Sequence, residues 1–266
     1  MSSPTTTANT HSTSSTRPTT NVSQRRISLI AGISLLVIAL LSPFALFGVL
    51  QALVVPEDAT ATFNNIIASE GLFRSGIAAF LIVIMLDVVV AWGLYVLLEP
   101  LNRRLALLTA WLRVAYAVVF ASALVSLLDA AELVAGAGQS ALQPEQLHAQ
   151  VLSSIASFEG GWVAISLAIF GLHLAGLGYL VFRSVNFPRF LGVLVAIAGG
   201  GYLFDSFGTI LVADYALSIG AFTFIGEALL IFWLFWRAAK GFRIEQELSG
   251  RSVTEPQLPH PSAVLS

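Results

Sequence analysis

The chain has 266 residues, of which 56% are hydrophobic and 11% charged, and its formal net charge is −2. A soluble domain carries about 25% charged residues, so this composition excludes an ordinary soluble fold and predicts a protein whose solvent is lipid. The balanced charge gives no general attraction to nucleic acid, and the lack of cysteine excludes disulfides, thiolate nucleophiles and cysteine-ligated metals.

Residues 1–24 are rich in Ser and Thr and nearly devoid of apolar side chains. Such a segment cannot bury enough apolar surface to offset its loss of chain entropy, so we expect a disordered tail. The segment is unlike a signal peptide, because the apolar run that follows it is far longer than a signal core. Residues 244–266 are predicted to form a second flexible tail, and both tails are expected in the cytoplasm.

Between the tails, residues 25–243 contain six apolar stretches of about the 20 residues that a helix needs to cross a bilayer. Lipid offers the backbone no hydrogen bonds, so each stretch is expected to be helical. The predicted fold class is therefore an all-α polytopic membrane protein with six transmembrane helices. The expected spans are roughly 27–54, 72–98, 105–128, 155–182, 190–212 and 217–236.

The positions of Lys and Arg predict the orientation of these helices. With the N-terminus inside, twelve of the thirteen basic residues fall on the inner side, and Arg74 alone falls outside. This asymmetry follows the positive-inside rule, which places both termini in the cytoplasm.

The two long outer segments, 56–71 and 143–161, also have helical patterns. Each is expected either to prolong the helix that follows it or to lie on the outer surface. Pro43 is expected to kink the first helix, because it lacks a backbone donor. Small residues around Gly171 and Gly199 favour close packing of the fourth and fifth helices. A faint likeness between helices two and three and helices four and five leaves open whether the two hairpins are a repeat.

Two blocks of the sequence carry a family resemblance. The block 68–117 contains Leu72-Phe73-Arg74, Pro100-x-Asn102-Arg103 and Arg113, and the block 170–206 contains Gly178-Tyr179-Leu180, Pro188 and Tyr202. From about residue 26 to about residue 242, the chain resembles the bacterial integral-membrane family catalogued as Domain of Unknown Function 4386. The resemblance implies a multi-pass protein of the bacterial plasma membrane, surrounded by membrane lipids. It implies no catalytic residue, because the family has no established activity to carry over.

Four ionisable residues fall at about the same depth in four different predicted helices, counting about 1.5 Å per residue. They are Asp87, Arg113, His173 and Glu227. A charge at the bilayer centre costs about 2.5–3.5 kcal/mol on insertion scales, and a partner at the same depth reduces that cost. We therefore expect an intramembrane polar cluster in which Asp87 pairs with Arg113.

This cluster has two interpretations. It is either a structural clamp that fixes helix packing, or a functional site in which a spare carboxylate beside His173 holds a proton or binds a cation. No second histidine lies at ligand spacing, so neither a metal nor a cofactor is expected. A second, outer polar group consists of Glu70, Arg74, Asp129 and Glu159. It is either a set of solvated interfacial charges or a shallow vestibule.

Three classes of function fit these features: a membrane scaffold or accessory protein, a small proton-linked carrier or permease, and an intramembrane enzyme or lipid-binding sensor. The sequence contains no G-x-S-x-G, H-E-x-x-H or P-loop motif, which weakens the case for an enzyme. Protein partners and oligomeric state are not encoded in any recognisable motif.

Overall fold

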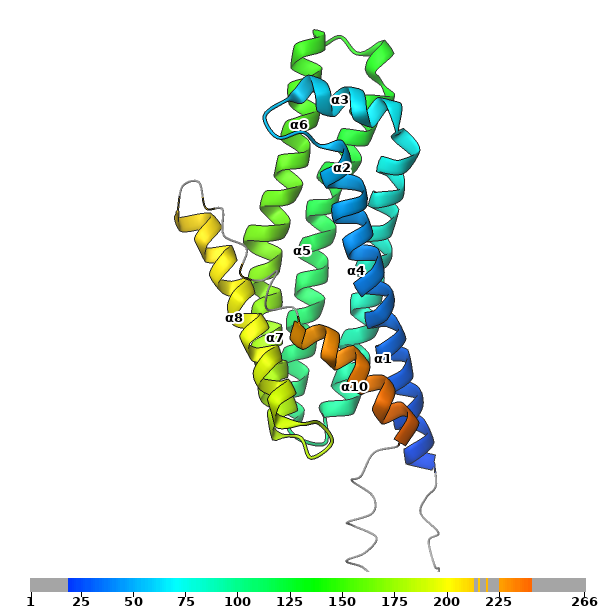
Figure 1. The fold of residues 1–266 in the computed structure, drawn as a ribbon, viewed down its shortest axis with the longest axis vertical. Helices are drawn as coiled ribbons and strands as arrows, with labels where there is room; N and C mark the ends of the chain where they lie inside the picture. The colour runs from blue at the N-terminus through cyan, green and yellow to red at the C-terminus, as the bar shows by residue number, and fades with distance from the viewer. Residues whose placement is uncertain (1–18, 213–214, 216–218, 220–224, 241–266) are drawn as a thin grey trace, which may run out of the picture.

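The structure is a computed structural model that describes residues 19–212, 215, 219 and 225–240 (Figure 1). Within these residues every regular element is a helix, as the fold class predicted. The predicted tails lie outside this part of the chain, except that residues 19–24 belong to the first helix. The division into tails and membrane domain therefore stays a prediction.

The first membrane helix is a continuous run of three segments. Helix α1 (Thr19–Pro43) continues through a π-helical segment, η1 (Phe44–Leu50), into α2 (Gln51–Leu53). The π-helical turn starts directly after Pro43, where the backbone has no N–H to donate. The disturbance expected at Pro43 thus takes the form of a change in hydrogen-bonding register.

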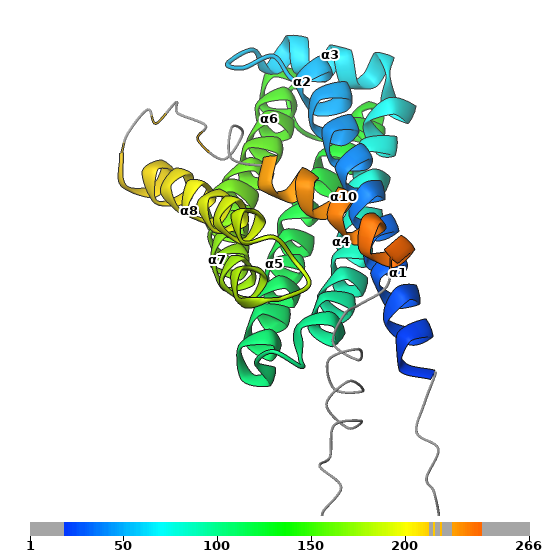
Figure 2. The same cartoon turned by 60° about the horizontal axis from the view of Figure 1, so that its bottom comes forward.

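The two outer segments differ from each other: one lies across the end of the bundle, and the other prolongs the helix that follows it. Helix α3 (Ala59–Ala68) is capped by Asp58, whose side chain accepts from the Ala61 N–H at 2.8 Å, and it lies across the end of the bundle (Figures 1 and 2). Helix α6 (Pro144–Gly160) instead runs on through a π-helical segment, η3 (Gly161–Ser166), into α7 (Leu167–Arg183).

The remaining elements are α4 (Glu70–Leu98), α5 (Arg103–Ala135), η2 (Ala137–Gln139), α8 (Arg189–Leu211) and α10 (Ile225–Lys240). Five segments of the described chain are long and apolar enough to cross a membrane: Gln24–Leu53, Glu70–Leu98, Arg103–Ala135, Pro144–Arg183 and Arg189–Leu211. The sixth expected span, 217–236, corresponds to α10, whose 16 residues are fewer than a full crossing requires. Most of residues 217–224 lie outside the described part.

Six helices pack in a closed ring. Around it, α1 contacts α4, α4 contacts α5, α5 contacts α7, α7 contacts α8, α8 contacts α10, and α10 returns to α1. In both views α10 runs obliquely across α1 and α4 (Figures 1 and 2). It therefore closes the ring at an angle to the other helices. This arrangement turns one side of every membrane helix toward a common centre.

Glycines bring α7 and α8 into backbone contact. A Cβ atom on Gly171 would lie 2.7 Å from the carbonyl oxygen of Gly199, and one on Gly178 would lie 2.6 Å from that of Gly192. Any larger residue at these positions would force the helices apart. The close packing of these two helices that the sequence predicted is therefore present. Gly176 faces α5 instead, because its Cβ would lie 2.6 Å from the Cγ2 atom of Thr109.

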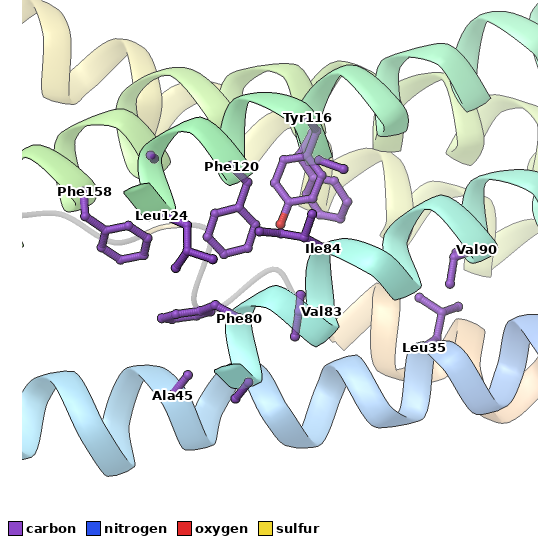
Figure 3. Close-up of a cluster of buried hydrophobic side chains, with 14 of the residues drawn as sticks. Leu35, Ala45, Phe80, Val83, Ile84, Val90, Tyr116, Phe120, Leu124 and Phe158 are labelled. Atoms are coloured by element: carbon purple, nitrogen blue, oxygen red, sulfur yellow. The ribbon is translucent and has the colours of Figure 1, made fainter. Parts of the chain in front are cut away.

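The core beside the ring centre is aromatic (Figure 3). The ring of Phe80 on α4 lies 5.4 Å from those of both Phe120 on α5 and Phe158 on α6, and all three side chains are buried. Trp162 stacks on Phe120 at 5.5 Å and Phe158 at 5.8 Å. The π-helical segment η3 that carries Trp162 packs against α5 and turns the indole into this cluster.

Candidate functional site: a buried arginine joining three helices

Asp87 and Arg113 form an ion pair at the ring centre. They lie on α4 and α5, which form an antiparallel hairpin around the turn at residues 99–102. Arg113 donates to Asp87 Oδ1 from Nη2 at 2.6 Å and from Nε at 2.9 Å. The two side chains are only 3% and 2% exposed. Asp87 and Arg113 therefore lie not only at the same depth, as the sequence predicted, but also on helix faces that point toward each other.

His173 on α7 is the second neighbour of Arg113. Its Nδ1 lies 2.8 Å from the carbonyl oxygen of Thr109, and a carbonyl only accepts, so Nδ1 carries the proton. Its Nε2 lies 3.2 Å from Arg113 Nη1 and accepts from the guanidinium. This geometry assigns the neutral Nδ1–H tautomer, because a proton on Nε2 would point at the cation. His173 is therefore a poor proton carrier in this arrangement.

An aromatic ring completes the surroundings of the guanidinium. Arg113 Cζ lies 5.2 Å from the centroid of the Phe170 ring, which is within cation–π range. Phe170 also lies one turn before His173 on α7, so a single helix face supplies both groups. Arg113 is thus held by a carboxylate, an imidazole and an aromatic face from α4 and α7.

The second oxygen of Asp87 is unusual. Both arginine donors converge on Oδ1, and Oδ2 is buried with no hydrogen-bond partner among the described residues. Leaving such an acceptor without a partner costs about 1–3 kcal/mol, and more for a charged group. The pair is therefore less than fully satisfied, although its charges balance.

Glu227 lies near this cluster without touching it. It stands in the first turn of α10, is half-buried, and accepts a hydrogen bond from the Tyr202 hydroxyl of α8 at 3.0 Å. The Tyr202 ring meets Phe170 edge-on at 5.6 Å, and Phe170 in turn lies under Arg113. The structure thus brings three of the four predicted residues into contact and separates the fourth from them by aromatic rings.

The predicted outer polar group does not converge. Glu70 and Arg74 form an ion pair at 2.7 Å within one turn of α4, with both side chains substantially exposed. Asp129 on α5 and Glu159 on α6 are also exposed, and within the described residues no hydrogen bond or ion pair joins them to that pair. The geometry matches separate surface charges better than a shared vestibule.

Sequence reasoning missed a polar clamp at the other end of α10. Arg237 donates to the Asn186 side-chain oxygen, and Trp233 Nε1 donates to the Asn186 carbonyl at 3.0 Å. Ser28 Oγ on α1 donates to the Leu234 carbonyl of α10 at 2.9 Å. Backbone carbonyls are the acceptors in both the Trp233 and Ser28 contacts, as at His173, and sequence patterns carry no signal for such partners.

Within the described residues, no group of three His, Cys, Asp or Glu side chains could hold a metal ion. Both nitrogens of His173 are engaged. What the arrangement does well is to neutralise one carboxylate in an apolar environment while tying three helices together.

Comparisons with known proteins agree on a family without an assigned activity. The family model described as "Domain of unknown function (DUF4386)" matches residues 30–238. An "Uncharacterized protein" of Archaeoglobus fulgidus is 32% identical over 173 residues, which cover 65% of this chain and 88% of that relative. That relative is archaeal, so the match does not support the bacterial origin that the resemblance implied. No solved structure matches the chain. The chain is a helical membrane protein that belongs to the DUF4386 family.

Proposed function

We propose that this protein is a multi-pass scaffold or accessory protein of the cell membrane, with a helix ring locked by Arg113. The observation that carries the proposal is the burial of Asp87, Arg113 and His173, which are each 3% exposed or less. A binding or transport site must meet water or ligand at some stage, whereas these three side chains meet only one another and the core. Arg113 is their common partner, so it acts as the hub of α4, α5 and α7.

The charge balance of the hub fits a structural role. One Asp87 carboxylate neutralises one guanidinium, and His173 in its Nδ1–H form adds no charge. A buried pair of this kind contributes little net stability compared with apolar residues, but it penalises any packing that separates its members. It therefore favours one relative rotation of the three helices over others.

We further propose six crossings with both termini in the cytoplasm. In support, the start of α1, the end of α10 and the two hairpin turns at 99–102 and 184–188 all lie at one end of the bundle, opposite α3 (Figure 1). Reporter fusions after residues 100, 186 and 245 should report the cytoplasm, and a fusion after residue 140 the outside. A cytoplasmic signal at residue 140 would refute this topology.

A proton-linked carrier is the second candidate, and Glu227 is the observation that favours it. Glu227 is half-buried in the ring, and its carboxylate accepts a hydrogen bond from the neutral Tyr202 hydroxyl. A carboxylate at membrane depth without a bonded cation is a common feature of proton and ion pathways. In such a carrier, Glu227 would take up and release the proton, and the Arg113 hub would hold the neighbouring helices in place.

Reconstitution into liposomes separates the two candidates. A purified scaffold should leave an imposed pH gradient as stable as in empty liposomes, and Glu227→Gln should change nothing. A gradient that wild-type protein dissipates, and that Glu227→Gln preserves, would replace the scaffold proposal with the carrier. Tyr202→Phe is the matched variant, because it removes the hydrogen bond to Glu227 and keeps the carboxylate.

A further inference from the structure

The lipid-facing side of the α4–α5 hairpin carries a groove that the ring centre does not use. It is about 190 Å³ in volume, its walls expose only apolar atoms, and α4 and α5 contribute equally to it. Ala91 and Ala110 are the small residues along it, and Ala91 is only 2% exposed, which places it at the floor. Trp92 and Trp111 are 50% and 64% exposed and form the rims.

The groove leads toward the cytoplasmic turn of the hairpin. On α4 it extends from Val88 to Tyr95, which is about 10 Å at 1.5 Å per residue. About one turn further lie Glu99, which follows the last residue of α4, and Arg103, the first residue of α5, and the two pair at 3.3 Å. The apolar groove therefore ends beside a charged pair, Glu99 and Arg103, which we call its polar mouth.

The charge of this mouth is positive. Arg103 is 76% exposed despite its pair with Glu99, so its guanidinium keeps free donors toward solvent. Arg104 is also exposed and has no carboxylate partner among the ion pairs of the described chain. One carboxylate and two guanidinium groups leave a net charge of +1, which a single phosphate monoanion would balance.

We propose that the α4–α5 groove binds one anionic phospholipid, with an acyl chain between Trp92 and Trp111 and the phosphate at Arg103 and Arg104. An acyl chain is the occupant that the dimensions favour. The groove volume of about 190 Å³ suits part of one acyl chain, whereas a helix of a second copy is about 10–12 Å across with its side chains. Basic side chains at the cytoplasmic ends of membrane helices attract anionic headgroups, and tryptophan is enriched in the region beside the headgroups.

Native mass spectrometry of the purified full-length chain tests this assignment. The probes are phosphatidylglycerol, phosphatidylethanolamine and diacylglycerol with identical acyl chains, together with glycerol phosphate, which lacks them. We expect one phosphatidylglycerol molecule to be retained more tightly than the other three probes. Arg104→Gln, which leaves the Arg103–Glu99 pair intact, should weaken phosphatidylglycerol binding about fivefold and leave diacylglycerol binding unchanged.

Two further variants test the two ends of the site. Arg103→Gln combined with Arg104→Gln should weaken phosphatidylglycerol binding about twentyfold. Ala110→Leu fills the floor from the lipid side and should displace both phosphatidylglycerol and diacylglycerol. The matched controls are Arg189→Gln, an exposed arginine beside the other hairpin turn, and Ala115→Leu, an exposed alanine of α5 outside the groove.

Several outcomes would overturn the proposal. Equal retention of phosphatidylglycerol and phosphatidylethanolamine would remove the role of net charge, and equal retention of diacylglycerol would remove that of the phosphate. An Arg189→Gln effect as large as that of Arg104→Gln would indicate general surface attraction. A dimer that Ala110→Leu dissociates would assign the groove to a second copy of the chain.

Discussion

Two arginine–carboxylate pairs of nearly identical length occupy opposite environments in this molecule. Arg113 and Asp87 meet at 2.6 Å with side chains 3% and 2% exposed, and Arg74 and Glu70 meet at 2.7 Å with side chains 48% and 40% exposed. The first pair joins two helices across 26 residues of sequence, and the second spans a single helical turn. Distance alone therefore says little about what either pair contributes.

Because their environments differ, the two pairs differ in how much stability is lost when one partner is removed. In the exposed pair, each charge can return to water or headgroups when its partner is removed, so the pair contributes little. In the buried pair, a stranded charge has no solvent to return to, so removing one partner destabilises the fold strongly. The comparison predicts a large coupling energy at the ring centre and a small one at the outer end of α4.

The largest effect is expected from single substitutions at the hub. Asp87→Asn and Arg113→Gln should each lower the free energy of unfolding by about 3–5 kcal/mol, because each leaves one buried charge without its partner. The double variant should recover a substantial part of that loss, since neither charge is then stranded. Thermal unfolding of the four proteins in one detergent provides the measurement, and strictly additive losses would contradict the pairing.

A smaller effect is expected at His173. His173→Leu removes the acceptor of Arg113 Nη1 and the donor to the Thr109 carbonyl, and should cost about 1–3 kcal/mol. In an Arg113→Gln background the same change should cost less, because one of its two contacts is already altered. An undiminished cost in that background would mean that His173 contributes through packing and not through Arg113.

Much of the hub could be predicted from the sequence, and the reasons are physical. Helix rise is constant, so counting residues gives the depth of a side chain in the membrane. The cost of a bare charge in hydrocarbon then demands a partner at that depth. These two rules placed Asp87, Arg113 and His173 together. They could not separate Glu227 from the three, because depth does not fix the rotation of α10.

Other features depend on tertiary packing and had no sequence signal. The proton position on His173 follows from the Thr109 carbonyl, which every residue type supplies equally. Phe170 is one of many apolar residues on α7, and only the structure shows that it lies under Arg113. The two outer segments had similar helical patterns, yet the chain breaks at Ser69 between α3 and α4, whereas α6 continues through η3 into α7.

Phe170 should show an intermediate effect that depends on the charge above it. Phe170→Leu removes the aromatic face and should cost about 0.5–2 kcal/mol more than packing alone accounts for. Phe158→Leu is the matched control, because Phe158 is equally aromatic and buried but belongs to the uncharged cluster with Phe80 and Trp162. In an Arg113→Gln background the excess cost at Phe170 should vanish, while the cost at Phe158 should stay the same.

The smallest effect is expected at the outer pair, where it completes the comparison. Arg74→Gln and Glu70→Gln should each change the free energy of unfolding by about 0.5 kcal/mol or less, because an exposed pair four residues apart on a helix contributes only a few tenths. Raising the salt concentration should abolish this difference, since exposed charges are screened, and should leave the Asp87–Arg113 coupling almost unchanged. A coupling at Glu70–Arg74 as large and as insensitive to salt as the one at the hub would show that the outer end of α4 is enclosed in the native protein, for example by a partner.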